Sequence, residues 1–156
     1  VEKHKNISGE IDIYAILVEP LNASSMRQCS EDFLQKLRKI CDRHKIVLIF
    51  DEVLSGFKTG VSCGQGYYGV IPDLCVIGKA LSNNVPLGVV AGKKKIMDRI
   101  MDPVDPVVSG GTFSGNQLGI AAGNASLDIL MQEHFYKNFQ DRLDELILLS
   151  FFYITK

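Results

Sequence analysis

The sequence predicts an α/β fold in which a mostly parallel sheet carries helices on both faces. Short, nearly continuous apolar runs indicate strands that are buried on both sides, as in parallel sheets. The first run is 13–19 and the second is 46–51, and the segment 31–44 between them has the spacing of an amphipathic helix. A strand, a helix and a further strand in this order form the unit from which parallel sheets are built.

The segment 31–44 carries helix signals along its whole length. Ser30 before it is a favourable N-cap, acidic residues occupy the first turn, and Arg43 and His44 occupy the last turn. Its apolar residues recur at steps of three and four: Phe33, Leu34, Leu37, Ile40 and Cys41. This spacing puts them on one face, which predicts a helix packed against the sheet.

Two more strands are expected at 73–78 and 88–92, because both segments are apolar and are bounded by turns with glycine or proline. After them we expect a helix over 94–101, a proline-rich loop, and a long helix over 116–134. The final segment, which reads LILLSFFYITK, is unusually apolar for an exposed terminus, and we expect it to lead into further structure.

The composition is typical of a soluble globular domain and gives no sign of a nucleic-acid or membrane partner. The chain has 17 basic and 18 acidic residues and a formal net charge of −1, so it has no overall field that would attract a polyanion. It has no apolar run of the ~20 residues that a membrane helix requires, and no signal-peptide pattern at its start. Its four cysteines form no CxxC pair, so we expect reduced thiols, no metal site and a cytoplasmic location.

The second predicted strand ends in two adjacent acids, Asp51 and Glu52. An apolar strand that ends in Asp-Glu is typical of the Walker B element of ATPases, but it also suits a carboxylate that binds the ring nitrogen of an organic cofactor. A nucleotide site needs a phosphate loop, and the GK pair at 78–79 does not provide one. Asp73 occupies the position of the first glycine and Ala80 that of the hydroxyl residue. A nucleotide-binding ATPase fragment is therefore the weaker alternative.

A second nucleotide signature, GQGYYG at 64–69, fits the pattern G-x-G-x-x-G. In dinucleotide-binding folds this pattern follows a strand and opens a helix. Here it follows a loop and leads through Pro72 into a predicted strand. We therefore expect a glycine-rich turn whose two tyrosines pack or line a cleft.

Asp51, Lys79 and the loop GGTFSGN at 110–116 together describe a site for pyridoxal phosphate. A lysine amine in a pocket of low polarity is kept neutral and can form a Schiff base with the aldehyde. A carboxylate on the pyridine nitrogen keeps that nitrogen protonated, so the ring can accept electrons. The amides and hydroxyls of the loop can bind an anion such as the phosphate, and a helix-capping loop is an equally good interpretation of the same residues.

Four segments resemble the class III pyridoxal-phosphate aminotransferases, nearest to the branch of the glutamate-1-semialdehyde 2,1-aminomutases. They read AILVEP, LIFDEVLSGFKTG, YYGVIPDLCVIGKALSNNVPLGVVAG and GGTFSGNQLGIAAG. The resemblance implies part of the large domain of the fold-type I transferase fold over 1–135, with 136–156 starting the connection to a small C-terminal domain. It also implies a homodimer that uses pyridoxal 5′-phosphate, as a transaminase or an aminomutase, with a small-molecule amino donor and a keto or semialdehyde acceptor.

The resemblance implies roles for individual residues. Asp51 matches the partner of the pyridinium nitrogen, Val53 the residue that packs on the ring face, and Lys79 the Schiff-base lysine. Thr112 matches a threonine that reaches across the dimer interface to the cofactor phosphate of the other subunit. Glu52 is expected to have a supporting structural role.

The chain departs from the family at several places. Lys58 follows Gly-Phe where the family often has arginine, and Ser24 stands where members that act on ω-amino groups often carry glutamate. The glycine-rich segment after the lysine is replaced by Ser82-Asn83-Asn84. The family's first phosphate loop and ring-stacking residue have no match in this sequence. A non-catalytic fragment that can only dimerise or pack is therefore the main alternative function.

Overall fold

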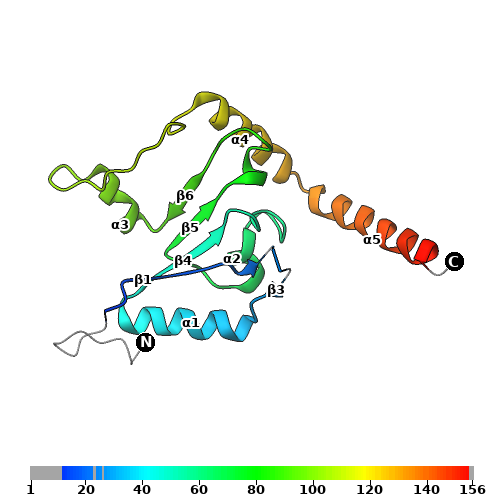
Figure 1. Ribbon diagram of the computed structural model, residues 1–156, viewed down its shortest axis with the longest axis horizontal. Coiled ribbons are helices and arrows are strands. Elements are labelled where there is room, and N and C mark those ends of the chain that lie inside the picture. Colours follow the sequence, from blue (N-terminus) through cyan, green and yellow to red (C-terminus); the bar gives the residue numbers. More distant parts are fainter. Residues whose placement is uncertain (1–11, 23, 26, 155–156) are drawn as a thin grey trace.

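Four strands form one sheet in the order β1-β4-β5-β6 (Figure 1). The computed structural model describes residues 12–22, 24–25 and 27–154. The strands of the sheet are β1 (Ala15–Val18), β4 (Val47–Glu52), β5 (Leu74–Ile77) and β6 (Val89–Gly92). β1, β4 and β5 are parallel, whereas β6 pairs antiparallel with β5. A separate antiparallel pair follows β1 and consists of β2 (Leu21–Asn22) and β3 (Arg27–Gln28).

The predicted α/β class and the four predicted strands are confirmed, with strand ends shifted by one or two residues. In the sheet, Val18 lies opposite Phe50, and Phe50 lies opposite Cys75. The carboxyl ends of β1, β4 and β5 therefore meet at one edge of the sheet, which we call the carboxyl edge. Functional residues that follow these strands lie close together in space, as is usual in parallel sheets.

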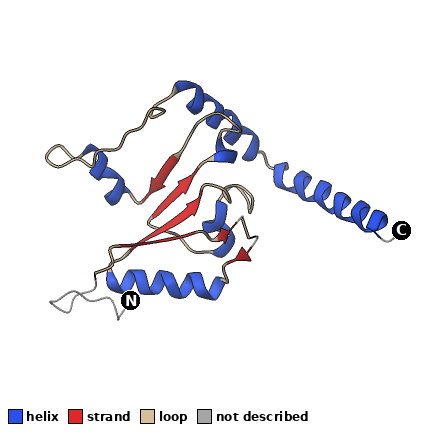
Figure 2. Cartoon of the chain, in the orientation of Figure 1, coloured by secondary structure: helices blue, strands red, loops and turns tan. Residues whose placement is uncertain are grey.

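The helix predicted over 31–44 is α1 (Glu31–His44), and its cap is the predicted one, because the Phe33 amide donates to Ser30 Oγ over 3.2 Å. The other helices are α2 (Cys63–Tyr68), α3 (Lys94–Met97), α4 (Gln117–Leu130) and α5 (Phe135–Ile154), with short 3-10 turns η1 (Lys79–Leu81) and η2 (Asp98–Met101). α5 extends away from the sheet (Figure 2). None of the helices in the described part of the chain is both long enough and apolar enough to cross a lipid bilayer.

The single helix expected over 116–134 is two helices in the structure. α4 ends at Leu130 and α5 begins at Phe135. Near this junction the hydroxyl of Tyr136 donates to the Phe57 carbonyl over 3.0 Å, and Leu130 packs on a cluster that contains Phe57. The residues between the two helices include no glycine or proline, so the break depends on these tertiary contacts rather than on a local signal.

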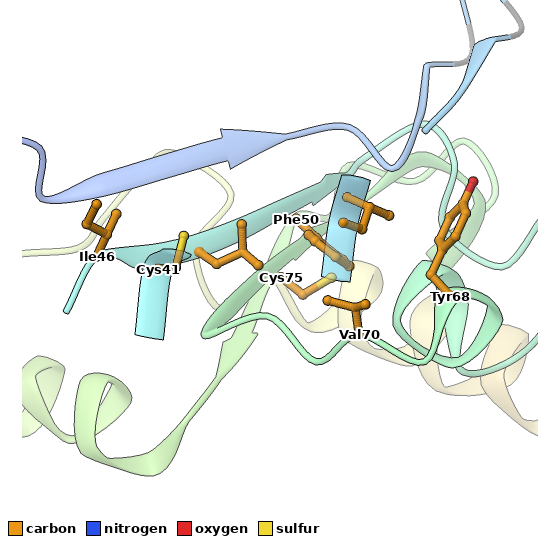
Figure 3. Close-up of a cluster of buried hydrophobic side chains, with 8 residues drawn as sticks. Cys41, Ile46, Phe50, Tyr68, Val70 and Cys75 are labelled. Carbon is orange, nitrogen blue, oxygen red and sulfur yellow. The ribbon is translucent and has the colours of Figure 1, made fainter. Parts of the chain in front are cut away.

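The main core lies between α1, α2 and one face of the sheet (Figure 3). Its buried members come from both helices, β4, β5 and the loops between them: Leu34, Cys41, Ile46, Leu48, Phe50, Tyr68, Val70 and Cys75. Burial of one Leu or Phe side chain contributes about 1.5–3 kcal/mol. This cluster therefore fixes α1 and α2 against β4. Cys41 and Cys75 are buried free thiols, as predicted.

The opposite face of the sheet is open at two large apolar residues. Leu17 of β1 and Val90 of β6 are 59% and 51% exposed. Successive side chains of a strand point to opposite faces, so residues that alternate with the core positions emerge here. The apolar sequence of the strands thus predicts more burial than the described residues provide.

The edge of the sheet opposite the carboxyl edge is held by a buried acid, Asp73. Its Oδ2 accepts hydrogen bonds from the Leu48 amide (2.7 Å) and from Arg38 (2.9 Å), and Lys93 Nζ lies 2.6 Å from its Oδ1. Burial alone would raise the pKa of Asp73, but the bonds from Lys93, Leu48 and Arg38 outweigh burial and hold the pKa below its usual value. Asp73 thus ties α1, β4 and the end of β6 together.

Candidate active site

Asp51 and Val53 lie at the carboxyl edge, where β4 ends and a tight turn begins. Asp51 is half-buried, and its Oδ1 accepts the amide N–H of Val53 over 3.1 Å. A bond from a carboxylate to the backbone two residues later is typical of an Asx turn. The Gly56 amide then donates to the Glu52 carbonyl over 2.9 Å. A Cβ at Gly56 would lie 2.7 Å from that carbonyl oxygen, so the turn requires glycine there.

Lys79 reaches the same edge from the neighbouring strand. β5 ends at Ile77, and Gly78 connects this strand to Lys79. A Cβ at Gly78 would lie 3.4 Å from Val53 Cγ1, so Val53 packs on the backbone that carries Lys79. Three of the predicted site residues, Asp51, Val53 and Lys79, therefore lie at the same end of two paired strands.

The backbone around Lys79 is in an unusual conformation. Lys79 has a φ of 43°, in the left-handed region that glycine enters without steric cost. Asn83 and Asn84 have φ values of 47° and 78°, and asparagine tolerates this region better than most residues. The asparagines that stand in place of the family's glycines therefore keep a backbone that glycine would adopt.

The side chain of Lys79 is exposed and lines a cavity. The cavity has a volume of about 330 Å³ and is formed by Lys79, Asn83, Asn84, Val85, Pro86 and Leu87. These residues supply one amine, two amides and an apolar wall. A small polar molecule or a ring with polar substituents could be held next to the amine.

Glu52 lies on the other side of β4 from Asp51, because neighbouring side chains of a strand alternate. It is 1% exposed, its Oε2 accepts the Gly64 amide over 2.7 Å, and its Oε1 lies 3.8 Å from the sulfur of Cys75. Burial raises the pKa of Glu52, and the bonds from Gly64, Cys75 and Gln65 offset only part of that effect. The second acid of the pair thus bonds the start of α2 instead of facing the carboxyl edge.

The GQGYYG segment is mostly helical, so the expectation of a glycine-rich turn is wrong. α2 spans Cys63–Tyr68 and ends at Gly69, which has a φ of 60°. Tyr68 is buried and donates its hydroxyl to the Pro20 carbonyl over 3.2 Å, whereas Tyr67 is exposed. The segment therefore packs α2 against the chain that follows β1, which is a structural role.

A small polar network follows β1 at the carboxyl edge. Asn22 Nδ2 donates to Glu19 Oε2 over 3.2 Å, and the amide and hydroxyl of Ser25 donate to Asn22 Oδ1 over 2.9 and 2.7 Å. Ser24, at the position where some family members carry glutamate, is an exposed turn residue. Glu19 is therefore the acid that β1 contributes to this edge.

Thr112 belongs to a different segment from the other predicted site residues, the loop before α4. It is exposed in the loop before α4, and it does not line the cavity around Lys79. The same loop caps α4, because Asn116 Oδ1 accepts the amides of Leu118 (2.9 Å) and Gly119 (3.2 Å). The helix-capping interpretation of GGTFSGN is confirmed, and the role of Thr112 toward a second subunit stays a prediction.

The sequence did not identify the cavity residues Asn83 and Asn84, or the bond between Glu52 and Gly64. Two successive asparagines after a site lysine were a usable signal, since asparagine favours left-handed backbone. No local pattern marks the Glu52 bond, because its partners are 12 residues apart and meet only when α2 folds against β4.

Residues 2–148 match the family described as aminotransferase class-III. The glutamate-1-semialdehyde 2,1-aminomutase of Cytophaga hutchinsonii is 43% identical over 150 residues, which cover 94% of this chain and 33% of that protein. The glutamate-1-semialdehyde 2,1-aminomutase 2 of Lachnoclostridium phytofermentans is 40% identical over 141 residues, which cover 85% of this chain and 33% of that protein. The chain thus spans about a third of the length of these curated relatives.

Solved structures give the same assignment of the fold. An omega-transaminase from Sphaerobacter thermophilus has a TM-score of 0.66 and 36% identity, with 73% of this chain and 26% of that chain covered. The FumI protein of Sphingopyxis sp. MTA144, in its PLP internal aldimine form, has a TM-score of 0.70 and 26% identity, with 79% and 30% covered. These likenesses confirm the predicted fold-type I transferase fold.

Proposed function

Because the chain belongs to the class III aminotransferase family, we propose that its carboxyl edge is the cofactor centre of an enzyme that moves amino groups with pyridoxal 5′-phosphate. The observation that carries the proposal is the packing of Val53 on Gly78. With this contact, Asp51 and Lys79 lie at the ends of two paired strands. The whole protein would act on a small-molecule amino donor and a keto or semialdehyde acceptor. The relatives named as 2,1-aminomutases support the aminomutase reaction over transamination.

The residues at this edge fit the cofactor. Lys79 has an exposed amine beside a cavity of about 330 Å³, and Asp51 has a half-buried carboxylate. A Cβ at Gly78 would lie 3.4 Å from Val53 Cγ1, so Val53 lies next to the backbone that carries Lys79. When bound, pyridoxal phosphate supplies an aldehyde that attaches to amino groups and a ring that accepts electrons from the substrate.

Each residue has one task in this proposal. Lys79 Nζ would hold the cofactor through its aldehyde, with release of water, and would move the proton at the substrate Cα. Asp51 holds a proton on the ring nitrogen, since an adjacent carboxylate favours the charged pyridinium. Val53 packs on the ring face and excludes water there. Thr112 binds the cofactor phosphate of a second subunit in a homodimer, where its loop amides and hydroxyl serve as donors.

Borohydride reduction in the presence of pyridoxal phosphate tests this assignment. Mass spectrometry should find a pyridoxyl adduct on the peptide that contains Lys79, and Lys79→Ala should remove it. The exposed lysines Lys93, Lys94 and Lys95 serve as internal controls, because their labelling should not change in the variant. Even labelling of all four lysines would refute the assignment and would favour a fragment that binds no cofactor.

A further inference from the structure

Glu52 is a buried acid that neither forms an ion pair nor is expected to touch the cofactor. It is 1% exposed, and the ion pairs of the described residues do not include it. A buried carboxylate is costly unless hydrogen bonds compensate for lost water. Its partners are the amide of Gly64 at 2.7 Å and the thiol of Cys75, whose sulfur lies 3.8 Å away. The reason for a buried acid at this site therefore has to be sought in the neighbours of Glu52 along the chain.

Glu52 lies between the two residues of β4 and its turn that are expected to touch the cofactor. Asp51 precedes it and Val53 follows it. Alternation along the strand directs Glu52 into the core and Asp51 to the other face. Because the two residues are adjacent on the strand, a shift of the backbone at Glu52 would also move Asp51.

The end of β4 is held at Glu52 from two directions. Its carbonyl accepts the Gly56 amide over 2.9 Å, which closes the turn. Its carboxylate bonds α2 through Gly64, and β5 lies beside it through Cys75. α2 has no side-chain cap of its own at Ser62, so the carboxylate is the acceptor that the start of this helix uses.

We infer that Glu52 is a positioning residue, which anchors the end of β4 to α2 and thereby fixes Asp51 and Val53 in the orientation that the cofactor requires. The inference rests on the proposed function for its last step. Glu52 does not touch the cofactor in this account. It acts through the backbone and through its neighbours, whereas a purely structural Glu52 would affect only the stability of the fold.

The test compares Glu52→Gln with a matched control, Asp73→Asn. Both changes replace a buried carboxylate by the amide of the same size, and both acids accept a backbone amide at 2.7 Å. Asp73 precedes β5 at the opposite edge of the sheet, so its loss should lower stability without moving Asp51. A difference between the two variants in the measurements below therefore reports a change in the position of Asp51 and not a loss of stability alone.

Amide hydrogen exchange without cofactor is the first measurement. Glu52→Gln should speed exchange at Gly64 and at Val53, whose amide bonds Asp51, by about tenfold relative to the wild type. Asp73→Asn should speed exchange at Leu48, whose amide bonds Asp73, and should leave the exchange rates of Gly64 and Val53 unchanged relative to the other amides of β4. Unchanged exchange at Val53 in Glu52→Gln would overturn the inference, even if Gly64 exchanged faster.

The second measurement is cofactor binding. It is monitored through the visible absorption of added pyridoxal phosphate between pH 6 and 9. Glu52→Gln should weaken binding about tenfold and shift the pH dependence of the absorption, since Asp51 would hold the ring proton less well. Asp73→Asn should change binding less than about twofold at temperatures where it stays folded. Equal effects in the two variants would show a structural role only.

Gly64→Ala perturbs the same contact from the helix side and leaves Glu52 intact. The new Cβ would lie 3.1 and 3.2 Å from the two carboxylate oxygens and 3.2 Å from Pro20 Cβ, so Glu52 has to shift. This variant should reproduce the binding and pH changes of Glu52→Gln, and wild-type behaviour would contradict the inference. If the wild type bound no cofactor, the proposed function would fail, and exchange at Val53 would still decide whether Glu52 sets the end of β4.

Discussion

Replacing Lys79 by glycine should stabilise the protein relative to Lys79→Ala, although both variants lose the amine. The φ of Lys79 is 43°, and a side chain in this region costs about 1–2 kcal/mol. Alanine keeps that cost because its Cβ remains. Glycine removes this cost. However, the greater freedom of glycine in the unfolded chain lowers the stability of the folded state by about 0.5–1 kcal/mol. The expected net difference between the two variants is about 1 kcal/mol, which corresponds to about 2–4 °C in Tm for a chain of this length.

Urea unfolding and thermal unfolding of the two variants measure this difference directly. Ala80→Gly is the matched control, because Ala80 is the next residue in the same 3-10 turn and is not among the residues with positive φ. Its replacement should lower stability by about 0.5–1 kcal/mol. If Lys79→Gly proved no more stable than Lys79→Ala, the backbone at Lys79 would carry no such strain.

Three further predictions concern other parts of the molecule. Asp73→Asn should cost about 3 kcal/mol in urea unfolding, because it leaves Arg38 and Lys93 without their buried acid. The pKa of Asp73 is lowered in the folded state. Its contribution to stability is therefore complete above the unfolded pKa and is lost as pH falls through the folded pKa. The variant should accordingly lose less stability in acid than the wild type. Asp51→Asn in the whole enzyme should reduce turnover by roughly ten- to a hundredfold while retaining part of the cofactor, and normal turnover would mean that Asp51 only caps its turn. Leu17→Lys combined with Val90→Lys should reduce self-association of the 156-residue chain in analytical ultracentrifugation, because both side chains are exposed on the open face; unchanged association would place the contact elsewhere.

The parts of the fold that could be predicted are those with local signals. α1 begins and ends where Ser30 and the basic last turn indicated, because capping is decided by neighbouring residues. The strands were identifiable from their apolar runs, but exposure at Leu17 and Val90 was not, since the sequence of a strand does not reveal what covers it. The break between α4 and α5 depends on Tyr136, which bonds a residue far away in the sequence.

The candidate site could be predicted only where local sequence signals mark its residues. Asp51 and Lys79 follow apolar runs, and strand ends gather at one edge in a parallel sheet. The bond between Glu52 and Gly64 could not be anticipated, because α2 was expected to be a turn. Thr112 was identified through resemblance, and it is not among the residues that line the cavity at Lys79.

The pairing of β4 with β5 gives the candidate site a rigid frame. Asp51 lies opposite Val76 in the strand register, and Lys79 follows shortly after Val76. Neighbouring strands are about 4.8 Å apart, so the sheet itself sets the spacing between the two site segments. Loop fluctuations on the nanosecond scale should change this spacing little. Any closure over a bound molecule must therefore come from segments outside these strands. The ends of β4 and β5 should separate only when the sheet opens, as slowly as the most protected amides of β4 exchange.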